Sequence, residues 1–129
     1  MAVLQVPVSV GELLDKISIL EIKHARISDV DKRENVVCEL DALRQVRERA
    51  VPASTAVDAL CSQLRQVNEA LWSIEDDIRA CERAQCFDAE FIRLARSVYR
   101  TNDQRAALKR ELNELTGSTL VEEKSYEDY

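Results

Sequence analysis

The chain has 129 residues, a length that suits one domain with its own hydrophobic core. Hydrophobic residues make up 46% of it and charged residues 33%, but it has only two glycines and two prolines. Sandwiches and barrels need more turn residues, so this composition indicates long helices. The formal net charge of -6 opposes nonspecific binding to nucleic acid or to an anionic membrane.

The first residues show neither a targeting signal nor a membrane-spanning pattern. Residues 1–10 lack a basic start, a long apolar run and a small-residue cleavage site. No window of the chain approaches the roughly 18 apolar residues of a membrane span. We therefore expect a cytoplasmic protein without membrane insertion. Because Pro7 interrupts a partly β-branched stretch, residues 1–8 are predicted to be an extended lead-in.

A first helical hairpin is predicted over residues 9–50. Ser9 has the chemistry of an N-cap, and Glu12 follows it at the spacing of a capping box. Apolar residues then recur at steps of three and four, as on one face of a helix. Asp29 or Asp31 can cap the second helix, which a proline ends. Since only a short loop separates the two helices, we expect them to be antiparallel.

A second, longer hairpin is predicted over residues 54–116. The third helix carries an unbroken seven-residue apolar repeat toward Ala84. The fourth helix begins near Asp88 and ends at a C-cap provided by Gly117. At about 1.5 Å per residue these helices should each reach roughly 40 Å, against roughly 30 Å for the first pair. The shorter hairpin therefore cannot cover the whole of the longer one.

We thus predict a single all-α domain over residues 1–129, with two antiparallel hairpins forming a four-helix, coiled-coil-like bundle. Residues 118–129 are acidic, contain two tyrosines and show no helical period, so we expect an extended tail. An apolar helix surface that is left uncovered usually marks a site of association with another protein chain. A homodimer follows as an expectation, and another protein could bind through the bundle surface or the tail.

The densest polar cluster lies where the two long helices should face each other. Its members are Trp72, Glu75, Asp76, Arg79, Arg96, Arg100, Asn102 and Arg105. Guanidinium groups bind phosphates and carboxylates in a bidentate manner, and Glu75 or Asp76 could transfer a proton. The structural alternative is that the carboxylates of residues 75–77 neutralise the arginines of the fourth helix as interhelical pairs, in a polar layer that fixes the register.

The cysteines and the single histidine indicate little other chemistry. None of the four cysteines forms a CxxC pair and two lie on an apolar helical stripe, so buried free thiols are expected. His24 lies on the core stripe of the first helix, where a structural role is favoured over proton transfer with neighbours such as Asp15. We predict no metal site and no cofactor, because zinc-ligand spacings are absent and two glycines cannot build a phosphate-binding loop.

Four stretches resemble an uncharacterised family of small helical bacterial proteins. They are PVSVGELLDKISILEIK (7–23), LWSIEDDIRACE (71–82), FIRLARSVYRTNDQRAALKRELNEL (91–115) and LVEEKSY (120–126). The resemblance implies a cytoplasmic protein of Proteobacteria, encoded near genes for surface-polysaccharide synthesis and with no established activity. The pattern LWxxED followed by NDxR is also similar to a second helical family of unknown function. That similarity singles out Trp72, Glu75, Asp76, Asn102 and Arg105.

Two functions stay open at the level of sequence. The first is a helical interaction or scaffold protein, homo-oligomeric and linked to surface-polysaccharide synthesis. The second is an enzyme or binding protein for an anionic small molecule, such as a sugar phosphate or nucleotide sugar, that uses the arginine and carboxylate cluster. An open pocket around Trp72 and Arg105 would favour the second, whereas a closed ion-paired layer would favour the first.

Overall fold

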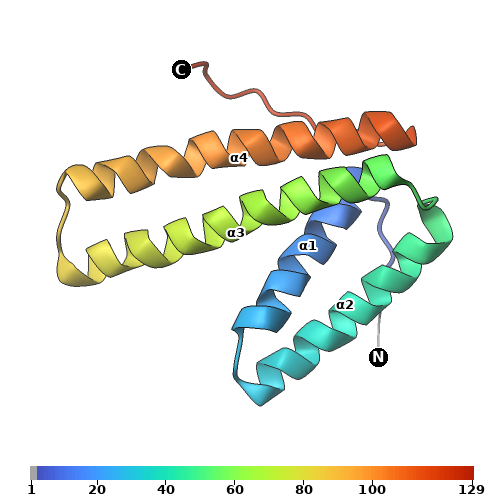
Figure 1. Cartoon of the computed structure of the whole chain (residues 1–129), viewed down its shortest axis with the longest axis horizontal. Helices are drawn as coiled ribbons and strands as arrows, with labels where there is room; N and C mark the ends of the chain where they lie inside the picture. Colours follow the sequence, from blue (N-terminus) through green and yellow to red (C-terminus); the bar gives the residue numbers. More distant parts are fainter. Residues whose placement is uncertain (1–2) are drawn as a thin grey trace.

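A computed structural model describes residues 3–129, so only residues 1–2 of the predicted lead-in lie outside it (Figure 1). Its helices are α1 (Val10–Arg26), α2 (Val30–Ala50), α3 (Thr55–Ala84) and α4 (Ala89–Thr116). No strand occurs within residues 3–129. The predicted all-α fold with two helical hairpins is therefore confirmed. None of the described helices is long and apolar enough to cross a membrane.

The helix ends follow the capping signals of the sequence. Each helix has an N-cap whose side chain accepts backbone N–H groups of the first turn: Ser9, Asp29, Ser54 and Asp88. Gly117 ends α4 in the left-handed region at a φ of 65°, as predicted. Gln85 ends α3 with a φ of 53°, a conformation that glycine adopts more readily. Local chemistry thus accounts for where the helices begin and end.

The two hairpins lie at an angle to each other (Figure 1). α3 and α4 run side by side along their length, and α1 packs against both of them in the half of the long hairpin away from its turn. α2 packs against α1 and reaches α3 through an ion pair between Arg47 and Asp58, at 3.1 Å. α1 is therefore the element that joins the short hairpin to the long one.

The hydrophobic core gathers around α1. It consists of Leu13, Leu14, Ile17, Leu20, Val36, Leu40, Val51, Val57, Leu64 and Leu112. By contrast, none of residues 69–93 is buried, although their apolar pattern continues. The prediction that the short hairpin covers only part of the long one is confirmed, because the half of α3 and α4 next to their shared turn lies outside this core.

α1 approaches α4 closely at Gly11. The Gly11 N–H donates to the Asn113 side-chain oxygen at 2.7 Å. A Cβ at this position would lie 2.5 Å from the backbone carbonyl oxygen of Lys109, well inside the contact distance. Only glycine fits here without a shift of one helix relative to the other.

We expect Gly11→Ala to lower the free energy of unfolding by about 1–3 kcal/mol, because the added methyl group overpacks the helix contact. At an exposed helical position the same change would raise stability by roughly 1 kcal/mol. Urea unfolding followed by circular dichroism measures the difference. Ala42→Gly, in the exposed middle of α2, calibrates the helix-propensity effect. A Gly11→Ala protein as stable as wild type would contradict the close approach.

Candidate functional site

A polar network lies where α1, α3 and α4 meet, and its centre is Asp15 of α1, which is only 1% exposed. Arg105 of α4 binds this carboxylate with Nε at 3.1 Å from both oxygens and Nη2 at 2.5 Å from Oδ2. Asn68 of α3 donates to Asp15 at 2.9 Å and to the Ser18 hydroxyl at 3.3 Å. Hydrogen bonding to Asp15 raises the pKa of Arg105.

Lys109 extends the network toward the tail. Its Nζ lies 2.7 Å from the Glu12 carboxylate, 2.6 Å from that of Glu122 and 3.9 Å from that of Asp15. Burial by itself would lower the pKa of Lys109, but hydrogen bonds to Glu12 and Glu122 outweigh burial and raise it. Reciprocally, the hydrogen bond from Lys109 lowers the pKa of Glu122. The buried ammonium thus ties the tail to the start of α1.

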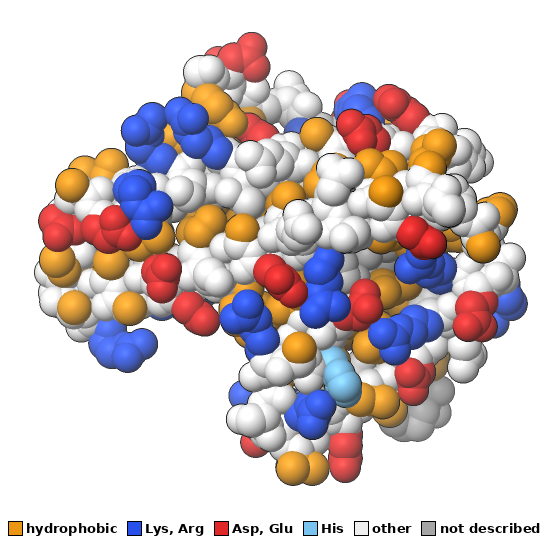
Figure 2. Space-filling model, in the orientation of Figure 1, with side chains coloured by type: hydrophobic (Ala, Val, Ile, Leu, Met, Phe, Trp, Pro, Cys, Tyr) orange, Lys and Arg blue, Asp and Glu red, His pale blue; other side chains and the backbone are white. Residues whose placement is uncertain are grey.

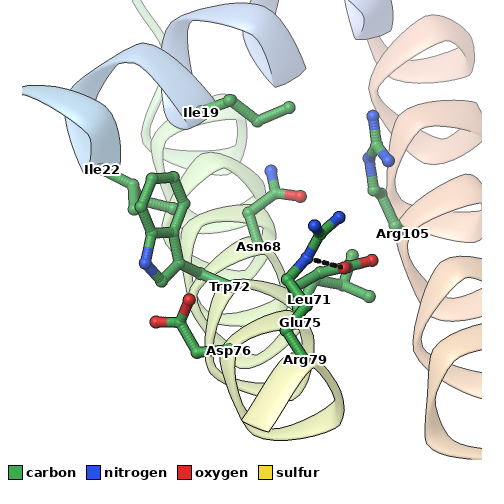
Figure 3. A pocket seen from close by; sticks show the side chains of 9 residues that line it. All are labelled: Ile19, Ile22, Asn68, Leu71, Trp72, Glu75, Asp76, Arg79 and Arg105. Atoms are coloured by element: carbon green, nitrogen blue, oxygen red, sulfur yellow. Dashed lines mark hydrogen bonds and ion pairs between the residues drawn. The ribbon is translucent and has the colours of Figure 1, made fainter. Parts of the chain in front are cut away.

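An open cleft of about 350 Å³ lies beside this network, in the angle between the two hairpins (Figure 3). Its lining residues are Ile19, Ile22, Asn68, Leu71, Trp72, Glu75, Asp76, Arg79 and Arg105. Glu75 pairs with Arg79 at 3.2 Å. The Arg26 guanidinium lies 5.9 Å from the centre of the Trp72 ring. The cleft therefore combines apolar walls with charges that are largely matched by each other.

The structure brings together five of the eight predicted site residues in this cleft: Trp72, Glu75, Asp76, Arg79 and Arg105. Arg96 and Arg100 instead line a separate surface hollow on α4, together with Arg93. Asn102 is half-buried and lines neither. The separation follows from helical geometry, because residues five or nine positions from Arg105 point to roughly the opposite side of a helix with 3.6 residues per turn.

The predicted interhelical pairing of residues 75–77 with the arginines of α4 is wrong. No ion pair joins α3 to α4 within residues 3–129. Arg105 pairs with Asp15 of α1, which sequence reasoning noted only as a neighbour of His24. The available signal was a carboxylate between apolar residues on the buried side of α1, but its partner lies 90 positions away in the chain.

The histidine and the cysteines also differ from expectation. His24 is exposed, so its placement on the core stripe is wrong; its Nε2 lies 3.2 Å from the Arg33 guanidinium. The cysteines are free thiols, as predicted, but none is buried: two are exposed and two half-buried. Within the described part of the chain, no group of three or more His, Cys, Asp or Glu side chains is arranged to hold a metal ion.

Comparison with known proteins gives a family and no activity. A family model, described as a family of unknown function (DUF6165), matches residues 4–129. The predicted resemblance to a helical domain of unknown function is thereby confirmed. No curated protein and no solved structure matches the chain.

We expect Arg105→Leu to cost about 3 kcal/mol of unfolding free energy, because it leaves the buried Asp15 carboxylate without its cation. Adding Asp15→Leu should restore most of this loss, since Asn68 keeps Ser18 as an acceptor. Arg79→Leu is the matched control: its partner Glu75 is exposed, so little change is expected. Chemical unfolding of the four proteins gives the comparison. Equal costs at positions 79 and 105 would rule out a special role for the Asp15 pair.

The docking of the tail should depend on pH through Glu122. Because its folded pKa is lowered, the stabilisation is present above the unfolded value of 4.5 and is lost as the pH falls through the folded value. We expect the amide NMR signals of residues 118–129 to move to unfolded positions below about pH 4.5, while the helical circular dichroism signal remains. Glu122→Gln should show part of this change at neutral pH. Glu127→Gln, at an exposed position, is the control, and a tail insensitive to both acid and Glu122→Gln would refute the coupling.

Proposed function

We propose that this chain, which belongs to the family of unknown function DUF6165, is a helical interaction protein that works as a homodimer. The observation that carries the proposal is that none of residues 69–93 is buried, although the apolar repeat of the long hairpin continues through them. An unpartnered helix surface of this kind usually marks an association site. The dimer contact is assigned to the half of the α3/α4 hairpin that α1 leaves uncovered.

The uncovered face continues the surface on which α1 packs. On α3, Asn68 faces α1, and Trp72, Glu75 and Arg79 follow it at helical spacings of four, seven and eleven residues. On α4, Val98 and Phe91 lie seven and fourteen residues before Arg105, on the same side of the helix and closer to the turn. Both are half-buried apolar residues. The long hairpin therefore extends a helix-packing surface beyond the element that uses it.

A second copy of the chain suits this face. At the turn, Phe87 and Phe91 form an edge-to-face pair with ring centres 5.1 Å apart, and Phe87 is 49% exposed. From residue 72 in the cleft to the end of α3 at residue 84, next to the turn, is about 18 Å of helix at about 1.5 Å per residue. Because this separation is the same in both copies, an antiparallel twofold arrangement places each aromatic turn against the partner's apolar cleft and closes the assembly.

A small-molecule anion site, with or without catalysis, has less support. The Arg105 guanidinium is bound to Asp15 and that of Arg79 to Glu75, so the cleft offers neither cation free to a ligand. Asp76 adds a further negative charge to the lining. The expected cytoplasmic location and the link to surface-polysaccharide synthesis remain part of the proposal, in which the dimer would bring partner proteins together.

Sedimentation velocity over a wide concentration range tests the dimer. We expect a species with twice the chain mass of 14.7 kDa at high concentration. Phe87→Ser should shift it to the monomer by removing the exposed aromatic at the turn. Ile92→Ser is the matched control, since Ile92 is 56% exposed at the same end of the hairpin but lines the hollow on the other side of α4.

The single tryptophan provides a second readout. Trp72 lies in the proposed contact, so its fluorescence should shift to shorter wavelength with rising protein concentration, and Phe87→Ser should abolish that shift. A wild-type protein that is monomeric at every concentration would contradict the proposal, as would equal effects of the two serine variants.

A further inference from the structure

Residues 118–129 run back along α4 in the direction opposite to the helix (Figure 1). Glu122 pairs with Lys109 at 2.6 Å and Glu123 with Arg110 at 2.7 Å. Nearer the turn of the hairpin, Tyr129 donates a hydrogen bond to the Asp103 carboxylate at 2.5 Å. The segment thus contacts α4 through carboxylates at one end and an aromatic side chain at the other.

Tyr129 rests on a small platform of one aromatic ring and one cation. Its ring centre lies 5.1 Å from that of Tyr99, in an edge-to-face arrangement. The Arg100 guanidinium lies 5.4 Å from the centre of the Tyr129 ring. We call the surface of α4 that these residues contact, from Tyr99 to Arg110, its outer side. It binds two chemical features together, negative charge and an aromatic ring.

The segment is held by contacts that a competitor can replace. All of residues 119–129 are exposed, and they form no regular secondary structure. The Glu123–Arg110 pair is exposed on both sides, and exposed ion pairs are individually weak and screened by salt. Segments of this kind exchange with similar sequences supplied by another molecule, since neither binding partner has to unfold first.

The basic surface of α4 extends further toward the hairpin turn than the segment does. Arg93, Arg96, Ser97 and Arg100 line a hollow of about 300 Å³ there. No carboxylate within residues 3–129 lies at ion-pair distance from Arg96 or Arg100. Arg96 lies three residues before Tyr99 on α4, a spacing that places the two side chains next to each other, and this cation lowers the pKa of the Tyr99 hydroxyl. Figure 2 shows Lys and Arg side chains gathered over the half of α4 nearest the turn.

We propose that the outer face of α4 is a binding site for an acidic, tyrosine-bearing peptide segment of a partner protein, and that residues 118–129 occupy this site in cis. A partner peptide that carries carboxylates beyond its tyrosine would pair with Arg96 and Arg100 as well. It would thereby gain charge-assisted contacts that residues 118–129 do not make. The part of the site formed by Arg96, Tyr99 and Arg100 lies on the side of α4 away from Arg105, so it is separate from the proposed dimer contact.

Fluorescence anisotropy with the full-length protein and two labelled peptides tests the proposal. The first peptide has the sequence of residues 118–129, STLVEEKSYEDY. The second has the same sequence with two glutamates added after its C-terminal tyrosine. We expect the longer peptide to bind roughly tenfold more tightly than the shorter one, an affinity gain of the size that new charge-assisted contacts give. Arg96→Gln should remove most of that gain. Arg83→Gln, at another exposed arginine without an ion pair on α3, is the matched control and should leave it intact.

Competition with the cis segment gives the second arm. A full-length protein carrying Glu122→Gln, Glu123→Gln and Tyr129→Ala should bind both peptides roughly tenfold more tightly than wild type, because its own segment no longer holds the site. In wild-type protein, NMR should show residues 118–129 moving to unfolded positions as the longer peptide binds. Absence of binding, binding without displacement of this segment, or equal effects of Arg83→Gln and Arg96→Gln would each overturn the proposal.

Discussion

The buried ion pair between Asp15 and Arg105 fixes how α1 lies on the long hairpin. A carboxylate that is 1% exposed is tolerated only when its charge and its lone pairs are matched. Arg105 supplies the charge from α4, and Asn68 supplies a further donor from α3. Because partners on two other helices must reach this one carboxylate, α1 is restricted to one register and one orientation on the long hairpin. The close approach at Gly11, one turn earlier on the same side of α1, follows from that placement.

The position of α1 determines which surface remains open. α1 has 17 residues, whereas α3 has 30 and α4 has 28. Anchored at Asp15, the short helix covers the part of the long hairpin away from its turn, and α2 packs on α1 without extending that cover. The exposed half of the hairpin and the cleft at its border are therefore two consequences of one mismatch in helix length, which is why the proposed dimer contact includes both.

Charge is distributed unevenly on this acidic protein. The net charge is -6, but cationic side chains gather on the outer side of α4. Residues 118–129 neutralise part of that surface through Glu122 and Glu123, and Lys109 connects the same segment to the buried network. The proposed binding site for an acidic partner thus follows from local matching of charge and not from the net charge of the protein. Since the two proposed surfaces lie on different sides of α4, self-association and peptide binding do not exclude each other.

The helices were predictable from the sequence because their signals are local. Capping residues such as Ser9 and Gly117 act within a few positions of the helix ends, and the apolar repeat is also a local pattern. The predicted helix lengths were enough to show that part of the long hairpin would stay uncovered. Five of the eight candidate site residues lie together because four of them occupy one stretch of α3 and Arg105 binds the same Asp15 carboxylate as Asn68 of that helix. Two features could not be predicted without the packing of the helices: Asp15 is the partner of Arg105, and Arg96 and Arg100 face away from the cleft. Both features depend on how α1 lies across the long hairpin, and the contacts that fix it join residues 53 and 90 positions apart in the chain.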